Sequence, residues 1–114
     1  MEDCLFCKVA GKKIKSDLIY EDDRTVAFRD INPQAPVHVL IVPKKHIPTL
    51  LDLKEEDKDI FWHLFSVVNT VARNEKVSDD GFRTLINCRA FGGQTVYHLH
   101  IHLLGGRFMR WPPG

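Results

Sequence analysis

The spacing of apolar residues predicts one long helix in the second half of the chain. Between Lys54 and Asn74, apolar side chains recur every three or four positions, as on a helix face that packs against a core. The members of this stripe are Ile60, Phe61, Leu64, Phe65, Val67, Val68, Val71 and Ala72. A short helical segment is predicted over residues 3–10, where Asp3 can cap the first turn and Gly11 can end the last.

Short runs of β-branched, aromatic and aliphatic residues predict the strands. These runs cover residues 18–22, 25–29, 37–42, 82–87 and 97–104. The third run is almost unbroken in its apolar character, which is typical of a strand buried on both faces. About five strands joined mostly by short turns, together with one long helix, predict an α+β domain with an antiparallel sheet.

Length and charge narrow the class of protein. The chain has 114 residues, which suits a single domain over 1–114, and its formal net charge is only +1. Because no basic stripe stands out, nucleic acid is not expected as a direct partner. No apolar run reaches the ~20 residues of a membrane span and no basic-then-apolar leader opens the chain, so we expect no membrane partner. Three cysteines without a leader indicate reduced thiols and a cytoplasmic protein, or also a nuclear one in a eukaryote.

The segment His98–Leu104 alternates histidine with apolar residues and carries the most chemical information. Side chains of a strand alternate between its faces, so His98, His100 and His102 are expected on one face. Their apolar neighbours would then pack on the long helix. The histidine row would span about 13 Å, which is too long for all three rings to act on one atom. A division of roles among the three is therefore expected.

Three interpretations of this row stay open from the residues alone. It is a chance run on a solvated strand face, a zinc site shared by two histidines at i and i+2, or a centre for nucleophilic and acid–base chemistry. The third interpretation needs an anion-binding loop nearby. Gly92-Gly93-Gln94-Thr95 offers one, because glycines at positive φ can turn backbone N–H groups toward a phosphate.

Further motifs extend the histidine row into a pattern that covers nearly the whole chain. They are Cys4-Leu5-Phe6-Cys7, the segment Phe28–Pro36, His38, Pro43-Lys44-Lys45-His46-Ile47, Gly92–Tyr97 and Trp111-Pro112-Pro113-Gly114. In this order they resemble the histidine triad (HIT) superfamily and, within it, the nucleotide-binding HINT branch. The resemblance implies a HIT-like fold with one long and one short helix, whose five-stranded sheet continues across a homodimer.

The resemblance also implies an activity. Members of this branch hydrolyse purine nucleoside 5′-phosphoramidates such as adenosine 5′-monophosphoramidate. By position, His100 would take the nucleotidyl group, and water would release the nucleoside monophosphate. His102 would contact the phosphate, while His38 and Thr95 would assist in proton relay and at the leaving group. A glutamine replaces the third histidine in the transferase branch, so His102 argues for water as the acceptor.

The nucleotide contacts implied by the resemblance come from both halves of the chain. They are Leu5, Phe6, Phe28, Asp30, Ile31, Asn87, Gly93, Gln94, Thr95, His100, His102 and Trp111. Asp30 would accept hydrogen bonds from the ribose hydroxyls, and the aliphatic and phenylalanine side chains would surround the base. Simpler roles are open: Phe28 and Ile31 in the core, Asp30 in a turn, and Trp111 as an anchor at the dimer interface.

Cys4 and Cys7 are candidate zinc ligands, because residues at i and i+3 of a short helix share one face. The pair alone is compatible with inert thiols or a redox pair. The resemblance supplies two further ligands, His46 and His98, for a structural zinc. No organic cofactor is expected, and neither Cys88 nor His63 is assigned a function.

One loop departs from the resemblance, and other functions remain possible. Cys88-Arg89-Ala90-Phe91 stands where relatives carry a small, glycine-containing stretch, and Arg89 could offer an extra phosphate contact. The alternatives are a nucleotide-sensing scaffold with an unknown regulatory protein partner, a dinucleotide polyphosphate hydrolase, and an open zinc site built from the three histidines of the row.

Overall fold

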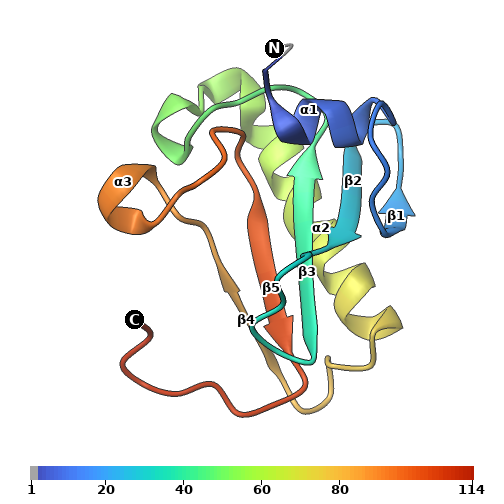
Figure 1. The fold of residues 1–114 in the computed structure, drawn as a ribbon, viewed down its shortest axis with the longest axis vertical. Coiled ribbons are helices and arrows are strands. Elements are labelled where there is room, and N and C mark those ends of the chain that lie inside the picture. Colours follow the sequence, from blue (N-terminus) through green and yellow to red (C-terminus); the bar gives the residue numbers. More distant parts are fainter. Residues whose placement is uncertain (1–2) are drawn as a thin grey trace.

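A five-stranded antiparallel sheet forms the centre of the fold (Figure 1). The computed structural model describes residues 3–114, so residues 1 and 2 of the predicted domain lie outside the described part. The strands are β1 (Leu18–Glu21), β2 (Thr25–Arg29), β3 (Val37–Pro43), β4 (Phe82–Leu85) and β5 (Ile101–Gly105). Their order in the sheet is β1-β2-β3-β5-β4. The predicted α+β class and the five-stranded antiparallel sheet are confirmed.

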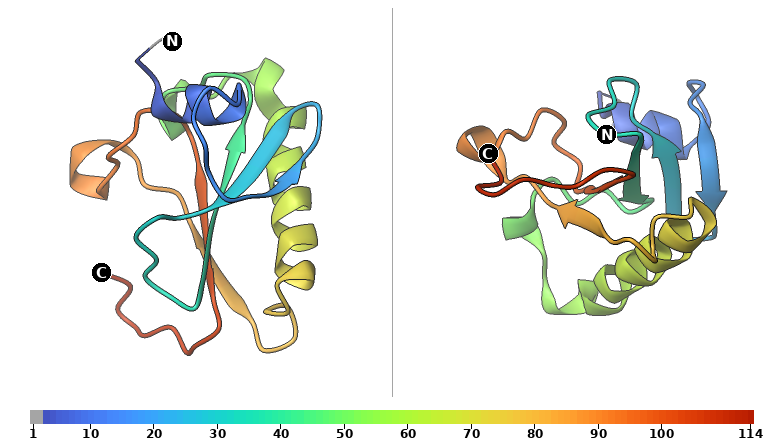
Figure 2. Two further views of the ribbon diagram at one scale, coloured as in Figure 1. Left: turned by 45° about the vertical axis from the view of Figure 1, so that its right-hand side comes forward. Right: turned by 90° about the horizontal axis from the view of Figure 1, so that it is seen from below.

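The two main helices lie on opposite faces of this sheet (Figure 2). The long helix α2 (Lys58–Asn74) crosses one face, and the short helix α1 (Leu5–Ala10) covers part of the other. A third helix, α3 (Arg89–Gly92), stands out beside the sheet, and two 3₁₀ turns, Leu50–Asp52 and Glu55–Asp57, precede α2. Among residues 3–114, no helix combines the length and the apolar character needed to cross a membrane.

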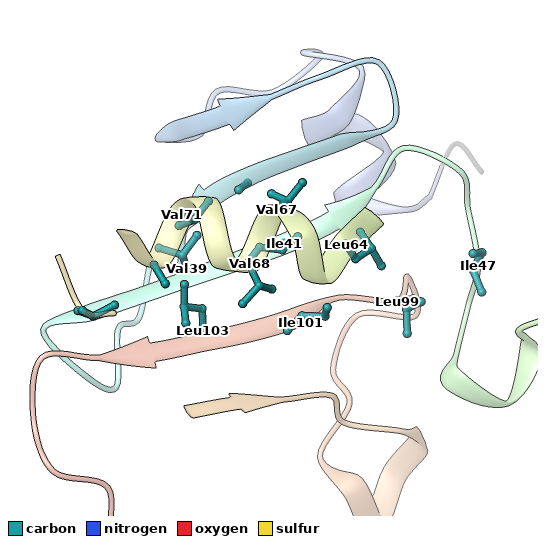
Figure 3. Packing of buried hydrophobic residues seen from close by; sticks show 13 residues of the cluster. Val39, Ile41, Ile47, Leu64, Val67, Val68, Val71, Leu99, Ile101 and Leu103 are labelled. Atoms are coloured by element: carbon teal, nitrogen blue, oxygen red, sulfur yellow. The ribbon is translucent and has the colours of Figure 1, made fainter. Parts of the chain in front are cut away.

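The main core lies between α2 and the sheet (Figure 3). Apolar side chains of α2 pack against inward-facing residues of β3 and of the segment that leads into and through β5. The labelled members are Val39, Ile41, Ile47, Leu64, Val67, Val68, Val71, Leu99, Ile101 and Leu103. A second cluster on the α1 face contains Phe6, Val9, Val26, Phe28, Leu40 and Val42. Because both faces of β3 are covered, its predicted burial on both sides is confirmed.

The helix starts differ from the prediction for local reasons. The long helix begins at Lys58, not Lys54, because the Asp57 carboxylate accepts a hydrogen bond from the Lys54 backbone N–H at 3.0 Å. This contact closes the preceding residues into a 3₁₀ turn. In α1 the cap is Cys4 instead of Asp3, since the Cys4 sulfur accepts from the Cys7 backbone N–H at 3.2 Å.

The strand ends also differ from the prediction, most clearly in β5. It begins at Ile101 and not at Tyr97, because Leu99 donates its backbone N–H to the Ile47 carbonyl at 2.6 Å and not to β3. The chain leaves the sheet there, and His98 lies outside it. Strand β4 ends at Leu85 instead of Asn87, β1 ends one residue early at Glu21, and α3 occupies part of the predicted loop over residues 87–95.

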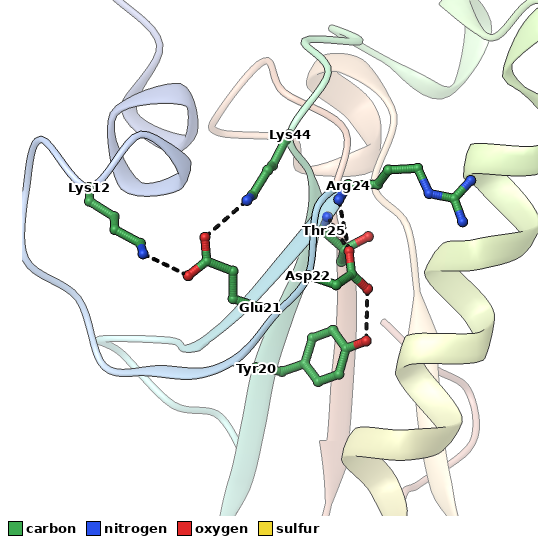
Figure 4. A network of polar contacts seen from close by, with 7 residues as sticks. All are labelled: Lys12, Tyr20, Glu21, Asp22, Arg24, Thr25 and Lys44. Atoms are coloured by element: carbon green, nitrogen blue, oxygen red, sulfur yellow. Dashed lines mark hydrogen bonds and ion pairs between the residues drawn. The ribbon is translucent and has the colours of Figure 1, made fainter.

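Asp22 organises the turn between β1 and β2 (Figure 4). One carboxylate oxygen accepts from the backbone N–H groups of Arg24 and Thr25, each at 2.8 Å. The other accepts from the Tyr20 hydroxyl at 2.7 Å and lies 2.6 Å from Nε2 of His63 on α2. Burial raises the pKa of Asp22, but the hydrogen bonds outweigh it and lower this pKa from 3.8 to about 2. The ionised carboxylate therefore ties the hairpin to α2.

Replacing Asp22 by asparagine is expected to lower the free energy of unfolding at pH 7 by about 2 kcal/mol. This is the free energy that corresponds to the lowered pKa of the Asp22 carboxyl. The folded pKa lies below the unfolded one, so this contribution is complete above about pH 4 and disappears as the pH falls toward 2. Urea unfolding of both proteins at pH 7 and pH 3 measures it. Asp23→Asn, at the exposed neighbouring position, is the matched control. Equal midpoints of wild type and Asp22→Asn at pH 7 would contradict the role of this carboxylate.

Candidate functional site

The structure divides the histidine row between two groups of side chains. The His98 ring points toward the cysteines of α1, with its Nδ1 atom 3.2 Å from the Cys4 sulfur. The His102 ring lies on the sheet face beside His38, with 3.0 Å between His38 Nε2 and His102 Nδ1. The His100 ring lies next to that of His102, at 4.9 Å between centroids. The three rings therefore face different partners.

His100 presents a single available nitrogen. Its Nδ1 lies 2.7 Å from the His98 carbonyl oxygen, and a carbonyl only accepts, so Nδ1 carries the proton. In the neutral ring, the lone pair is then on Nε2, the form that a nucleophile requires. Burial lowers the pKa of His100, although this hydrogen bond opposes the shift. The Phe6 ring meets the His100 ring edge-on at 4.9 Å and fixes its orientation.

A chain of hydrogen bonds sets the proton positions of the other two rings. The Gln34 backbone N–H donates to His38 Nδ1 at 3.0 Å, so the proton of neutral His38 is on Nε2. That N–H donates to His102 Nδ1, which leaves the proton of neutral His102 on Nε2. An Asp30 carboxylate oxygen lies 3.5 Å from His38 Nε2. We call this hydrogen-bonded arrangement, which ends on His102, the relay.

Burial keeps these rings neutral near pH 7. Burial, together with neighbouring His100 and His38, lowers the pKa of His102 to about 4, although the Asp30 carboxylate opposes the shift. Burial also lowers the pKa of His38, against the attraction of the Asp30 carboxylate. The tautomers assigned above are therefore the forms present at neutral pH.

Four side chains from separate parts of the chain converge at α1. The sulfurs of Cys4 and Cys7 and one ring nitrogen each of His46 and His98 all lie within 4.8 Å of one another. The Cys7 sulfur is 3.2 Å from His46 Nδ1 and 3.4 Å from His98 Nδ1, and the two Nδ1 atoms are 3.2 Å apart. A tetrahedral zinc with normal bonds to sulfur and nitrogen places its ligand atoms about 3.3–3.8 Å apart. The donor set fits zinc, and these ligand-atom distances lie within a few tenths of an ångström of this spacing.

The surroundings of this centre also suit a metal. His98 Nε2 donates to the Pro43 carbonyl at 2.7 Å, which leaves the Nδ1 lone pair directed at the cysteines. Burial, and then the neighbouring Cys4 thiol, raise the pKa of Cys7 to about 11. A bound divalent cation removes this penalty, because it stabilises the thiolate.

Asp30, His38 and His102 form a second group with converging ligand atoms. A cation on His38 Nε2 would displace the proton that sits there, and Nδ1 would then need to carry it against the Gln34 N–H. This hydrogen bond favours the relay over a metal. Among residues 3–114, His100 belongs to neither converging group, so the open zinc site built from the three histidines of the row is not formed.

The predicted apolar contacts differ in exposure. Phe6 and Phe28 are buried and pack edge-on at 5.4 Å between ring centroids. Leu5 is about half exposed, and Ile31 is 98% exposed. Phe6 and Phe28 therefore have a core role in addition to any contact with a ligand. Ile31 is not a core residue, which removes the simpler interpretation of that position.

The predicted anion-binding loop is held from within by Gln94. Its side chain is buried, accepts from the Arg89 backbone N–H at 2.8 Å, and donates to the carbonyls of Pro48 and Val96. These bonds occupy its side-chain amide. Its backbone N–H is also used within the loop, where it donates to the Arg89 carbonyl at 3.1 Å, and the Gly93 N–H donates to the Ala90 carbonyl at 3.0 Å. Gly93 has the expected positive φ of 85° but Gly92 does not, and Arg89 adopts a φ of 62°, which favours glycine.

Other predicted residues lie around this loop. Asn87 is half-buried just after β4. Thr95 is exposed and lines a hollow of about 430 Å³ together with Cys4, Leu5 and His46. Trp111 is 83% exposed in the C-terminal segment, which trails along the sheet edge away from α1 (Figure 1).

Two residues that support the relay had no role in the sequence analysis. Gln34 acts through its backbone N–H, and Arg107 donates to the Gln34 carbonyl at 2.9 Å. Both contacts are made by backbone atoms of Gln34, and no motif or spacing in the sequence indicates which backbone atoms will contact a side chain.

Comparisons with known proteins identify the family. The HIT domain model matches residues 11–109. The chain is 44% identical over 106 residues to the purine nucleoside phosphoramidase of Escherichia coli, covering 93% of this chain and 89% of that protein. It is 46% identical to a 14 kDa zinc-binding protein of Brassica juncea, covering 98% and 100%. A solved structure of a HIT family hydrolase from Legionella pneumophila superposes with a TM-score of 0.97 at 47% identity, covering 98% and 100%. The chain therefore belongs to the HIT family.

Proposed function

We propose that this HIT-family hydrolase cleaves purine nucleoside 5′-phosphoramidates through a nucleotidyl group held on His100. The observation that carries the proposal is the tautomer of His100, whose Nδ1–H is bound to the His98 carbonyl so that Nε2 is free to attack phosphorus. The name of the Escherichia coli relative supports this substrate class.

The reaction proceeds in two displacements at phosphorus. His100 Nε2 forms a bond to phosphorus as the phosphorus–nitrogen bond of the substrate breaks. The amine must leave protonated, and the relay of His38 and His102 lies closest to His100. Because its rings are neutral, the relay would take up one proton when the phosphate anion binds and then pass this proton to the amine. Water then attacks phosphorus, the bond to His100 breaks, and a proton from this water restores the relay. One water is consumed, and the products are the amine and the nucleoside monophosphate.

The nucleotide would lie on the α1 face of the sheet. Phe6, Phe28 and Ile31 would contact the base, and Asp30 the ribose. In the loop of residues 93–95, the N–H groups of Gly93 and Gln94 are bonded internally, so the backbone of Thr95 would contact the phosphate and its hydroxyl the leaving group. Leu5 would join the residues around the base, Asn87 would lie near the phosphate, and Trp111 would act on the site of a partner subunit.

Hydrolysis of adenosine 5′-monophosphoramidate by the wild-type protein tests the function. We expect stoichiometric release of AMP and ammonia, and no comparable turnover of a dinucleotide polyphosphate. Tight binding of AMP without turnover would instead support the nucleotide-sensing scaffold.

Removal of the Asp30 carboxylate is expected to weaken AMP binding by roughly 10- to 100-fold, as for the loss of one or two charge-assisted hydrogen bonds. The carboxylate is about one-fifth exposed, and one of its oxygens is already bound to the Asn32 backbone N–H at 2.8 Å. Calorimetry of wild type and Asp30→Ala with AMP measures the effect. Dideoxy-AMP, which lacks both ribose hydroxyls, is the control ligand and should bind both proteins alike. An equal loss for both ligands would contradict the ribose contact.

We also propose that the cluster of Cys4, Cys7, His46 and His98 holds a structural zinc. The four donors match the ligand set of a tetrahedral zinc site, and the name of the Brassica juncea relative supports this metal. When bound, zinc would cross-link α1 to the two loops that carry His46 and His98, and it would take no part in phosphoryl transfer.

A homodimer in which the sheet continues from one copy to the other remains our proposal for the assembly. Strand β4 lies at an edge of the sheet, and Arg83 on it donates to the Arg110 carbonyl at 2.9 Å. This bond holds the C-terminal segment, with exposed Trp111, beside the same edge. Analytical ultracentrifugation should give twice the chain mass, and a monomer would contradict the proposal.

A further inference from the structure

We propose that the cluster of Cys4, Cys7, His46 and His98 is a positioning centre for the nucleotide site: its occupancy by zinc sets the orientation of His100 and the position of Phe6. The proposal rests on the zinc and nucleotide sites proposed above and goes beyond both. It assigns this cluster an effect on nucleotide binding in addition to one on stability.

The first connection runs through His98. Its ring is fully buried, with Nδ1 in the cluster and Nε2 bound to the Pro43 carbonyl. Its own carbonyl oxygen accepts the Nδ1–H of His100 at 2.7 Å. The residue that would bind the metal therefore also holds the tautomer and the ring direction of the nucleophile. Any rotation of the His98 peptide would break this hydrogen bond.

The second connection runs through α1. Phe6 lies between the two cysteines in sequence, and its ring contacts both histidines, at 6.3 Å from His98 and 4.9 Å from His100 between centroids. It also packs on Phe28, the other buried ring of the predicted base site. A metal bound by Cys4 and Cys7 therefore fixes the backbone on both sides of this ring.

Helix α1 depends on such an anchor because it is short. It has six residues, about half the length at which an isolated helix becomes marginally stable. Its cap is the Cys4 sulfur, which would be a metal ligand as well. Only Phe6 and Val9 of its side chains are buried. Loss of the metal would thus loosen α1 while α2 and the sheet keep their own core.

The test measures the coupling between zinc and AMP in both directions. Wild-type protein is prepared with zinc and without it, and both forms are checked by circular dichroism before AMP is titrated by calorimetry. We expect the zinc-free form to stay folded and to bind AMP at least about fivefold more weakly. By linkage, saturating AMP should raise the affinity for zinc by the same factor, measured against a chromophoric chelator. The ¹⁵N resonance of the His100 Nδ1–H group should be sharp with zinc and broadened without it.

Two variants separate positioning from a general loss of stability. Phe6→Leu keeps all four ligands, so it should bind zinc while showing a smaller coupling factor. Asp22→Asn destabilises the β1–β2 hairpin, which carries none of the four ligands, and it should keep the wild-type coupling factor.

Three results would overturn the proposal. One is equal AMP affinity, within twofold, in both folded forms. Another is a zinc-free protein that is unfolded throughout, because zinc would then stabilise the whole fold instead of positioning the nucleotide site. The third is a coupling factor that falls as much in Asp22→Asn as in Phe6→Leu. None of these measurements requires turnover, so a protein that binds AMP but cleaves no phosphoramidate would disprove the proposed function and leave the coupling measurable.

Discussion

Replacing His100 by alanine is expected to reduce phosphoramidate hydrolysis at least roughly a thousandfold, about 4 kcal/mol of activation free energy, with little change in AMP affinity. The reason is the tautomer: with Nδ1–H bound to the His98 carbonyl, Nε2 of His100 is the nitrogen available to form the covalent intermediate. The other two rings offer no free lone pair. The His98 lone pair is on Nδ1, which faces the cysteines, and the His102 lone pair is on Nδ1, which accepts from His38. Steady-state kinetics and calorimetry on both proteins give the two quantities.

The His63→Ala variant is the matched control for this experiment. His63 lies on α2, on the opposite face of the sheet from α1, and contacts Asp22. Its loss should leave the turnover number unchanged while lowering stability. If His100→Ala retained wild-type turnover, the nucleophile assignment would be wrong, and the scaffold hypothesis would become the better account of the site.

Removing the metal is expected to lower the thermal midpoint by roughly 15 °C. With free zinc at about a thousand times its dissociation constant, binding to the folded state contributes about 4 kcal/mol, and each kcal/mol moves the midpoint of a domain of this size by roughly 4 °C. The cluster joins Cys4 and His98, which are 94 positions apart, so the zinc cross-link closes almost the whole chain. Differential scanning calorimetry with and without a chelator measures the shift.

Cysteine substitutions show whether this shift belongs to the cluster. Cys7→Ser should reproduce the effect of the chelator and abolish any further response to it. Cys88→Ser is the control, because Cys88 lies outside the converging group and should respond to the chelator as wild type does. A midpoint that is independent of the chelator in wild type would show that no structural metal is present.

The parts of the fold that could be predicted are those that depend on the local spacing of apolar residues. The stripe from Ile60 to Ala72 determines α2, because an apolar repeat of this kind fits one face of a helix and little else. The buried run of β3 is equally local. By contrast, the start of β5 depends on bonds from Leu99 to Ile47 and from His98 to Pro43, which connect distant parts of the chain. Alternation of residue type cannot show where such a strand leaves its sheet.

The candidate site follows the same division. The length of the row predicts a division of roles among the three histidines. The partners of His98, which are Cys4, Cys7 and His46, followed from the family resemblance and not from the spacing of the row. The side chain of Gln94 was expected near phosphate, yet it is buried and bonded to backbone atoms of its own loop and of Pro48. Whether a polar side chain serves a ligand or its own loop depends on three-dimensional contacts, and the residue type alone is compatible with both.

The backbone N–H that holds His38 has a consequence for how this site tolerates mutation. Any amino acid except proline supplies the same donor at position 34, so substitutions there can drift without disturbing the protonation state of the relay. A deep mutational scan should therefore show position 34 as permissive to every residue but proline, although the atom it contributes touches the machinery directly. Mutational tolerance at this position would then conceal an essential contact.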